Sequence, residues 1–305
     1  MRTAFIDTLN ELASQDERIW LLCGDLGFSV LESFAQHFPN RYLNVGVAEQ
    51  NMTGIAAGLA LSGKIVFTYS IANFPVMRCL EQIRNDVCAH NLNVKIVSVG
   101  GGFAYGSAGY THHGTEDLAV MRVLPNMTVL APGDPVETRL LTIAATARPG
   151  PCYLRLGKAG EPIIHTSHPD ITIGKAIVLR EGNDGTLIST GATLGMAMMA
   201  SSELLARGIS VSVLSMPTLS PLDKDAILRA ASNTGRIVTV ENHGLGGLGT
   251  AVAEVLAAST VTSRFSPLYL QARPATVAGS QAAMYASHHI TIPNIVSTMM
   301  SLLAP

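Results

Sequence analysis

The order of apolar segments is the feature that most constrains the fold of this chain. Short, continuous apolar runs predict strands, and they alternate with stretches of helical spacing. The runs lie at 18–25, 64–70, 94–100, 127–133 and 151–157. The helical stretches lie at 48–63, 75–91, 114–125 and 134–149. Strands that are buried on both faces and separated by helices are typical of parallel sheets. The first half therefore predicts an α/β fold on a doubly wound, mostly parallel sheet.

A stretch rich in Gly, Pro and His, "RLGKAGEPIIHTSHPDITIGKA" at 155–176, interrupts this alternation. A second and smaller alternation of strands and helices follows it, over 185–273. We therefore expect two doubly wound, mostly parallel-sheet domains. The first covers 1–160, a linker covers 161–174, and the second domain covers 175–305.

The composition excludes several classes of protein. Only 14% of the 305 residues are charged and 48% are hydrophobic, which predicts an oligomer, at least a dimer, with much of its surface covered. The net charge of −2 disfavours a nucleic-acid partner. No apolar run reaches the roughly 18 residues of a membrane span, and no signal peptide is evident, so we expect a cytoplasmic protein. The four cysteines form no CxxC pair, which favours reduced thiols over a zinc site.

The string "GLGGLG" at 244–249 has the spacing of a dinucleotide-binding loop. It follows a predicted strand and opens a predicted helix, but no acidic residue stands about 20 positions later, as that fingerprint requires. We interpret it as a flexible Gly-rich turn. The neighbouring His243 is expected at the surface or in a subunit contact.

A second Gly-rich loop, "GGGFAYGSAGYTHHGTED" at 100–117, ends in two adjacent histidines. Their spacing is poor for a metal site. Thr115 is a plausible helix N-cap, and the acids Glu116 and Asp117 suit the first turn of a helix. The loop either contacts a polar ligand or is an ordinary long connection.

Glu49 raises a separate question, because it stands in the apolar stretch "RYLNVGVAEQNMTGIAAGLALSG". A Glu in such surroundings should be largely removed from water, and a buried Glu needs a partner. The residues leave open whether that partner is a structural group or a ligand.

The chain as a whole resembles the pyrimidine-binding half and C-terminal domain of transketolase. The resemblance rests on "NVGVAEQNMTGIAAGLALSG", "EQIRNDVCAHNLNVKIVSVGGG", "THHGTEDLAVMRVLPNMTVLAPGDPVE", "PCYLRLGK" and "LISTGATLGMAMMASSELLARGISVSVLSMPTLSPLD". It implies a thiamine-diphosphate-dependent transferase of ketol units, of the transketolase type (EC 2.2.1.-). It also implies that Glu49 is catalytic, since the Glu of this motif shares a proton with N1′ of the cofactor's aminopyrimidine.

The same resemblance assigns further site residues one at a time. Asp25 would lie near the cofactor, and Phe74 would pack on the pyrimidine ring. The positions of two companion aromatics hold Ile71 and Met77 instead. Ser29 would face the distal end of the substrate and His112 the hydroxyls near the reacting carbon. Lys158 stands where an arginine usually binds the substrate phosphate.

The substrate loop departs from the family's pattern. Gly100, Gly101 and Ala108 stand where a His-Asp pair and a second Asp hold donor hydroxyls in transketolases of phosphorylated sugars. Hydrogen-bonding substitutes could come from Tyr105, Ser107, Tyr110 and His113. The resemblance thus implies that the cofactor chemistry is preserved while the donor or acceptor differs. It could be a modified or nucleotide-linked sugar, or a smaller α-keto acid.

The part of transketolase that binds the diphosphate through Mg²⁺ has no counterpart here. Its GDG…N motif is missing, and no cluster of oxygen ligands suits magnesium, so we expect no metal site in this chain. The chain therefore resembles the second subunit of a split transketolase, whose partner subunit carries GDG…N and ligates most of the Mg²⁺, in a heterotetramer. Two alternatives remain: a subunit similar to 1-deoxyxylulose-5-phosphate synthase or to the β chain of a 2-oxoacid dehydrogenase, and a catalytically silent scaffolding or regulatory subunit.

Overall fold

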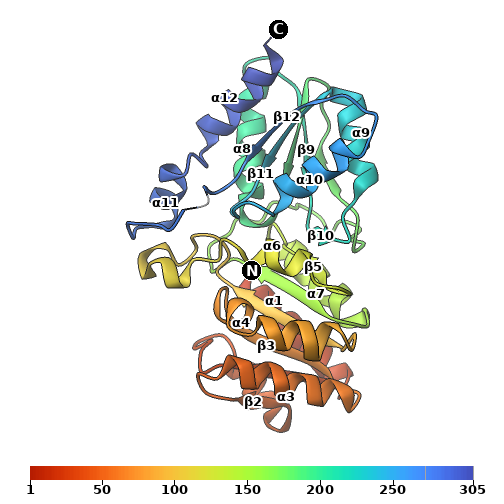
Figure 1. The fold of residues 1–305 in the computed structure, drawn as a ribbon, viewed down its shortest axis with the longest axis vertical. Helices are drawn as coiled ribbons and strands as arrows, with labels where there is room; N and C mark the ends of the chain where they lie inside the picture. Colours follow the sequence, from red (N-terminus) through yellow and green to blue (C-terminus); the bar gives the residue numbers. More distant parts are fainter. Residues whose placement is uncertain (272, 305) are drawn as a thin grey trace.

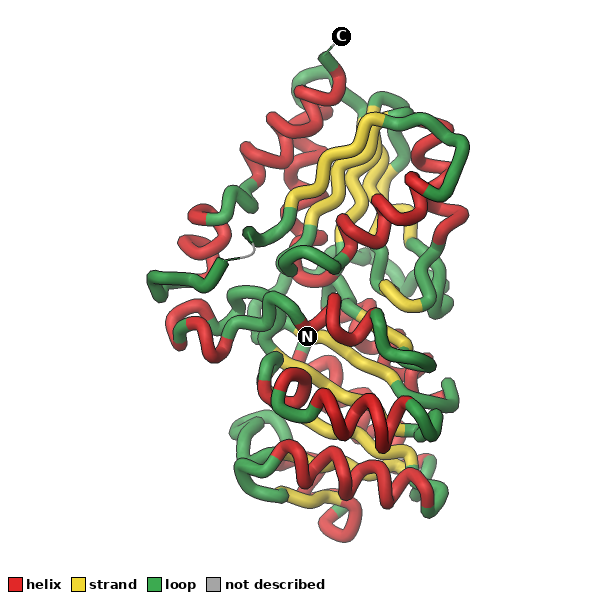
Figure 2. Tube along the Cα trace, in the orientation of Figure 1, coloured by secondary structure: helices red, strands yellow, loops and turns green. Residues whose placement is uncertain are grey.

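The computed structural model describes residues 1–271 and 273–304. Two α/β units follow each other along its long axis (Figure 1). Each is a twisted sheet with helices on both faces, as the strands and helices in Figure 2 show. The predicted fold class of two doubly wound, mostly parallel sheets is confirmed.

The first sheet contains all five strands expected from the apolar runs, and two more. Its order is β10-β5-β6-β4-β3-β1-β2, and every pair is parallel except β10 with β5. The expected strands are β1 (Ile19–Cys23), β3 (Ile65–Ile71), β4 (Val94–Val99), β5 (Thr128–Leu130) and β6 (Cys152–Leu156). The additional strands are β2 (Tyr42–Asn44) and β10 (Thr218–Ser220). The carboxyl ends of β1, β3 and β4 meet at one edge, where ligands bind in open α/β sheets.

Helices cover both faces of this sheet. Helix α1 (Arg2–Gln15) packs beside α7 (Pro135–Ala147). Helix α3 (Glu49–Leu61) packs on β3 beside the π-helical turn Ile83–Cys88. Two short helices, α2 (Glu32–His37) and α6 (Asp117–Arg122), lie in connections.

The helix predicted over 75–91 is broken into pieces, which corrects that expectation. The pieces are α4 (Phe74–Met77), α5 (Leu80–Gln82) and the π-helical turn. In that turn Ala89 N–H donates to the carbonyl of Arg84, five residues back. A π-turn inserts one extra residue into a helix, and such turns are frequent near functional sites.

The second sheet has the order β12-β11-β8-β9-β7 and is parallel except for the edge strand β7. Its strands are β7 (Ile177–Arg180), β8 (Gly185–Ser189), β9 (Val211–Ser215), β11 (Arg236–Val240) and β12 (Arg264–Leu268). Its helices are α8 (Leu194–Leu205), α9 (Lys224–Thr234), α10 (Leu248–Ala257), α11 (Gln281–Ser287) and α12 (Ile292–Leu303). Helix α12 packs on α8, and α10 packs on α9.

The two units are held together by a strand pair and by side-chain contacts, in addition to the segment that connects them. Strand β10 of the second half adds to the sheet of the first by pairing with β5. The connecting segment is also held, because Asp134 accepts from the backbone N–H groups of Ile164 and His165 at 2.9 and 3.0 Å. His165 Nε2 lies 2.9 Å from Glu137 Oε1. These contacts fix the second unit against the β5 end of the first sheet.

Candidate cofactor site

Glu49 is the first residue of α3, and its side chain lies against the end of β1. Only 1% of the residue is exposed. A Cβ built on Gly24, which follows β1, would lie 3.4 Å from Glu49 Cγ. The main chain at the strand end therefore lies next to the Glu49 side chain.

The partner of Glu49 in the structure is Arg78, which the sequence analysis did not find. Arg78 Nη1 donates to Glu49 Oε2 at 2.6 Å, and the arginine side chain is 46% exposed. Its Cζ also lies 5.2 Å from the centre of the Phe74 ring. The signal in the sequence is the spacing of Phe74 and Arg78, four residues apart in a helical segment, which places both on one face.

The structure brings several of the expected site residues together from distant parts of the sequence. The ring centres of Phe74 and His112 are 5.2 Å apart, and those of Tyr105 and His112 are 6.4 Å apart. Lys158 Nζ lies 4.9 Å from the centre of the Tyr105 ring. Phe74, His112, Tyr105 and Lys158 thus form one chain of contacts, and Arg78 connects Phe74 to Glu49.

The remaining expected residues lie at or just after the ends of β1 and β3, with one exception. Ile71 ends β3, and Met77 is 41% exposed. Asp25 and Ser29 are on left-handed backbone, with φ of 57° and 62°, in the loop after β1. Asp25 accepts from the Asn44 side chain at 2.9 Å, which connects the ends of β1 and β2.

The exception is His113, which turns away from its neighbour His112. It is fully buried, its Nε2 lies 3.3 Å from the carbonyl of Gly106, and its ring centre is 5.0 Å from that of Phe103. Phe103 in turn contacts His288 of the C-terminal domain, with ring centres 4.8 Å apart. In this structure His113 therefore packs the inner side of the loop and does not lie beside His112.

Two consecutive glycines stand at the start of the Gly-rich loop 100–117, and other groups lie so close to each of them that a side chain would not fit. A Cβ on Gly100, where φ is +89°, would overlap ring atoms of Tyr105. A Cβ on Gly101 would lie 2.5 Å from the guanidinium of Arg155. The Tyr105 ring therefore fills the space next to residue 100, and a larger residue cannot replace Gly100 in this arrangement.

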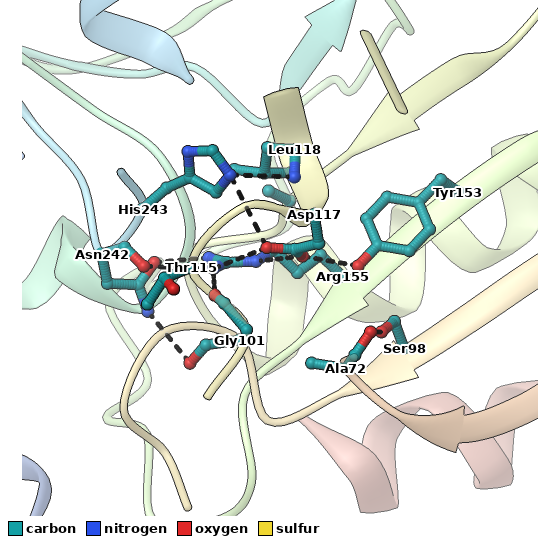
Figure 3. A network of polar contacts seen from close by, with 12 residues as sticks. Ala72, Ser98, Gly101, Thr115, Asp117, Leu118, Tyr153, Arg155, Asn242 and His243 are labelled. Carbon is teal, nitrogen blue, oxygen red and sulfur yellow. Dashed lines mark hydrogen bonds and ion pairs between the residues drawn. The ribbon is translucent and has the colours of Figure 1, made fainter. Parts of the chain in front are cut away.

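A buried polar network holds both ends of this loop (Figure 3). Asp117 accepts from Arg155 Nε at 2.7 Å and from the Tyr153 hydroxyl at 2.5 Å. Arg155 also donates to the carbonyl of Gly114 at 2.7 Å and to the Asn242 side chain at 2.5 Å. Since Asn242 belongs to the C-terminal domain, the network links β6, the loop that carries His112, and the second unit.

His243 belongs to the same network, which corrects the expectation that it lies at the surface. It is fully buried, and its Nε2 accepts from the backbone N–H groups of Leu118 and Ala119 at 3.0 and 3.3 Å. The ring therefore caps the start of α6. The expected cap, Thr115, instead donates to Glu116 at 2.8 Å, because α6 begins two residues later, at Asp117. Burial lowers the pKa of His243 to about 4.

The turn at 244–249 is closed by a carboxylate of the chain itself. Glu241 accepts from the N–H groups of Leu248 and Gly249, both at 2.7 Å, and burial raises its pKa to about 7. A Cβ on Gly247 would overlap a Glu241 oxygen. The start of α10, where a dinucleotide fold would bind pyrophosphate, is thus occupied, which supports the interpretation as a structural turn.

Comparison with known proteins identifies the family of this architecture. Residues 1–160 match the family "Transketolase, pyrimidine binding domain", and residues 174–295 match "Transketolase, C-terminal domain". The chain belongs to the transketolase family. Membership implies dependence on thiamine diphosphate, and the chain corresponds to the pyrimidine-binding and C-terminal part of the family.

Several of the similar proteins are named as transketolase subunits or as a split-gene transketolase. The chain is 43% identical over 266 residues to one of the subunits of apulose-4-phosphate transketolase from Phocaeicola vulgatus, covering 86% of this chain and 85% of that protein. It is 42% identical over 258 residues to 6-deoxy-6-sulfo-D-fructose transketolase subunit SqwH of a Clostridium species, covering 84% and 80%. A solved structure described as a split gene transketolase, inactive beta4 tetramer, superposes with a TM-score of 0.92 at 36% identity, covering 99% of this chain and 97% of that one.

The buried His243 generates a prediction about stability. A histidine whose pKa falls from 6.5 to about 4 on folding stabilises the fold above pH 6.5, and this contribution is lost as the pH falls through 4. Glu241, whose pKa is raised, acts in the opposite direction over a similar range. The variant His243→Gln isolates the histidine, because its side-chain oxygen can accept the same N–H groups without titrating.

We therefore expect the unfolding free energy of the wild type, relative to His243→Gln, to fall by about 3 kcal/mol between pH 7 and pH 4. Urea titrations of both proteins at several pH values measure this difference. A difference that does not change with pH would contradict the prediction.

Proposed function

We propose that this chain is the subunit of a split transketolase-like enzyme that supplies the groups around the cofactor's aminopyrimidine, in the transfer of a ketol unit between sugars or sugar-like substrates. The observation that carries the proposal is the placement of Glu49. Its carboxylate is buried at the end of β1, and it connects through Arg78 to Phe74 and His112. An acid held beside an aromatic ring in apolar surroundings fits an aminopyrimidine.

The chemistry of these residues matches what the pyrimidine ring requires. When bound, thiamine diphosphate supplies the carbanion chemistry of the reaction. Glu49 would share a proton with the ring nitrogen N1′, and a carboxyl group removed from water can do so without competition from solvent. Phe74 would pack on the ring, with Ile71 and Met77 completing an aliphatic wall, and Asp25 would lie near the cofactor.

The substrate would lie between the cofactor and the Gly-rich loop. His112 would face its hydroxyls, and the contacts of its ring with those of Phe74 and Tyr105 support this role. Lys158 is exposed and provides a positive charge for the distal end, and Ser29 lies in the loop after β1. Lysine binds phosphate or another anion as a point charge, without the fork of arginine.

A partner chain would complete the site. Within 1–271 and 273–304, no group of three or more His, Cys, Asp or Glu residues could hold a metal ion. We propose that Mg²⁺ and the diphosphate are held mainly by a partner subunit with a GDG…N motif. Large apolar side chains are exposed in the segment that precedes Glu49 in the sequence. Phe28 is 75% exposed and Val47 is 74% exposed. Such exposure suits a surface that a partner covers.

The proposed division of the site between two subunits also suggests an assembly and a location for the enzyme. We propose a dimer of such pairs, a heterotetramer, working in the cytoplasm on small molecules without nucleic acid. None of the helices in the described ranges is long and apolar enough to cross a bilayer.

The split-subunit proposal predicts weak binding by the isolated chain. Because the groups for Mg²⁺ and diphosphate are assigned to the partner, we expect little or no binding of thiamine diphosphate to this chain alone. Isothermal titration calorimetry with Mg²⁺ present measures this, and the mixture with the partner subunit is the positive control. Tight binding by the isolated chain would contradict the proposed division of the site.

The role of Glu49 predicts the effect of Glu49→Gln. An amide cannot share an acidic proton with N1′, so we expect proton exchange at C2 of bound thiamine diphosphate to slow by about 10²-fold or more in the reconstituted pair. Exchange is followed by NMR after quenching. Glu17→Gln, an exposed site before β1, is the matched control and should exchange at the wild-type rate. Wild-type exchange in Glu49→Gln would show that the residue is only structural.

The loop chemistry indicates an unusual substrate. The His-Asp pair and the second Asp of sugar-phosphate transketolases are replaced by Gly100, Gly101 and Ala108, and the ring of Tyr105 fills the space at residue 100. Two of the similar proteins are named for apulose 4-phosphate and for 6-deoxy-6-sulfo-D-fructose. We propose that the substrate of this chain is likewise a sugar other than the ordinary ketose phosphates, such as a modified sugar.

We therefore expect poor turnover of xylulose 5-phosphate with ribose 5-phosphate by the reconstituted pair. Each lost hydrogen bond to a charged group costs about 1.5–3 kcal/mol, so two or three losses lower kcat/KM by several orders of magnitude. Steady-state kinetics with this pair of sugars, and with apulose 4-phosphate or 6-deoxy-6-sulfo-D-fructose in place of xylulose 5-phosphate, measures the preference. A kcat/KM of about 10⁴ M⁻¹s⁻¹ or more for the ordinary pair would contradict it.

A further inference from the structure

The guanidinium of Arg78 makes both contacts that the aminopyrimidine ring would use. It donates from Nη1 to Glu49 Oε2 at 2.6 Å, and its Cζ lies over the face of Phe74, 5.2 Å from the ring centre. Under the proposed function, Glu49 binds a nitrogen of the ring and Phe74 packs on its face. One side chain of the protein therefore stands where the ring is expected.

The chemistry of the two groups is similar. A guanidinium is planar, delocalised and cationic, and it presents N–H donors at its edge. A protonated aminopyrimidine is also planar and cationic, with N–H donors at its edge. A site that holds one by a carboxylate at the edge and an aromatic ring at the face can hold the other in the same way.

We propose that Arg78 is a placeholder: it occupies the aminopyrimidine position of the chain without cofactor, and it must leave Glu49 before the ring can bind. This inference rests on the proposed function, and it assigns to Arg78 control over cofactor entry. It accounts for a buried carboxylate in the free subunit, because Glu49, at 1% exposure, would otherwise be a buried charge without a partner.

The surroundings of Arg78 allow the side chain to move outward. The side chain is 46% exposed, so solvent reaches it on one side. It also lines a shallow surface hollow together with Glu81 and Gln50. Glu81, three residues further along the chain, offers an alternative carboxylate for the displaced guanidinium. The side chain thus has a bound position on Glu49 and an outer position near Glu81.

Competition of this kind has a measurable consequence. The apparent dissociation constant of a ligand rises in inverse proportion to the fraction of molecules whose site is free. If Arg78 leaves Glu49 in about 1–10% of molecules, its removal strengthens binding of the ring by about tenfold to a hundredfold.

The test uses thiamine as the probe, because it carries the aminopyrimidine but no diphosphate and so needs neither Mg²⁺ nor the partner subunit. Its dissociation constant for the full chain is measured by ligand-observed NMR titration. We expect Arg78→Met to bind thiamine at least tenfold more tightly than the wild type. Arg84→Met is the matched control, since the Arg84 side chain lies in the same hollow but donates to Asn85 and not to Glu49, and it should bind as the wild type does.

A second measurement uses the wild-type protein and does not depend on the folding of a variant. The guanidinium signals of Arg78 in ¹⁵N-arginine-labelled protein are assigned by their absence in Arg78→Lys. Thiamine should shift them from the position of a group bonded to a carboxylate to that of a solvated group.

The results separate this inference from the proposed function. Three results would each overturn the placeholder role. The first is equal affinity of the wild type, Arg78→Met and Arg84→Met for thiamine, and the second is weaker or undetectable binding by Arg78→Met. The third is that thiamine leaves the Arg78 signals unchanged. The proposed function is decided separately, by cofactor binding and by Glu49→Gln in the reconstituted pair.

Discussion

The buried ion pair between Arg155 and Asp117 is the contact on which the arrangement of the site depends. Both side chains are at most 2% exposed, and each makes further bonds, to Tyr153, Gly114 and Asn242. The pair therefore fixes strand β6, the end of the substrate loop, the start of α6 and the C-terminal domain at one point. Losing one partner of such a pair typically costs about 3–5 kcal/mol, because the other is left as an uncompensated buried charge. The loop that carries His112 is thereby held at its base.

The same packing restricts which residues can stand at the start of the Gly-rich loop. The glycines at 100 and 101 leave room for the Tyr105 ring and the Arg155 guanidinium, so these two positions pack the loop. The two adjacent histidines pack differently. The ring of His112 lies next to those of Phe74 and Tyr105, whereas the ring of His113 packs on Phe103.

Much of the fold could be predicted from the sequence, because buried parallel strands are continuous apolar runs and five of them were evident in the first half. Strand β2 was missed since it has three residues, two of them exposed, and β10 since it pairs with a strand from the other half of the chain. The break in the helix at 75–91 was missed because a π-turn changes backbone bonding while its apolar residues still face the core. Glu49, Phe74 and His112 were proposed through motif resemblance, but Arg78 was not, because its partner is 29 residues away.

By itself the sequence determined the α/β class, the two sheets, the family resemblance and the identity of the acid proposed for catalysis. These depend on local periodicity and on short motifs, which neighbouring residues carry. Only the tertiary structure decided that His243 caps α6, that Glu241 closes the turn before α10, and that Arg78 pairs with Glu49. Each of these is a contact between residues distant in sequence, or a choice among several equally near polar partners. Burial determines these contacts, because a polar group removed from water must form a hydrogen bond with a partner that the folded chain brings within reach.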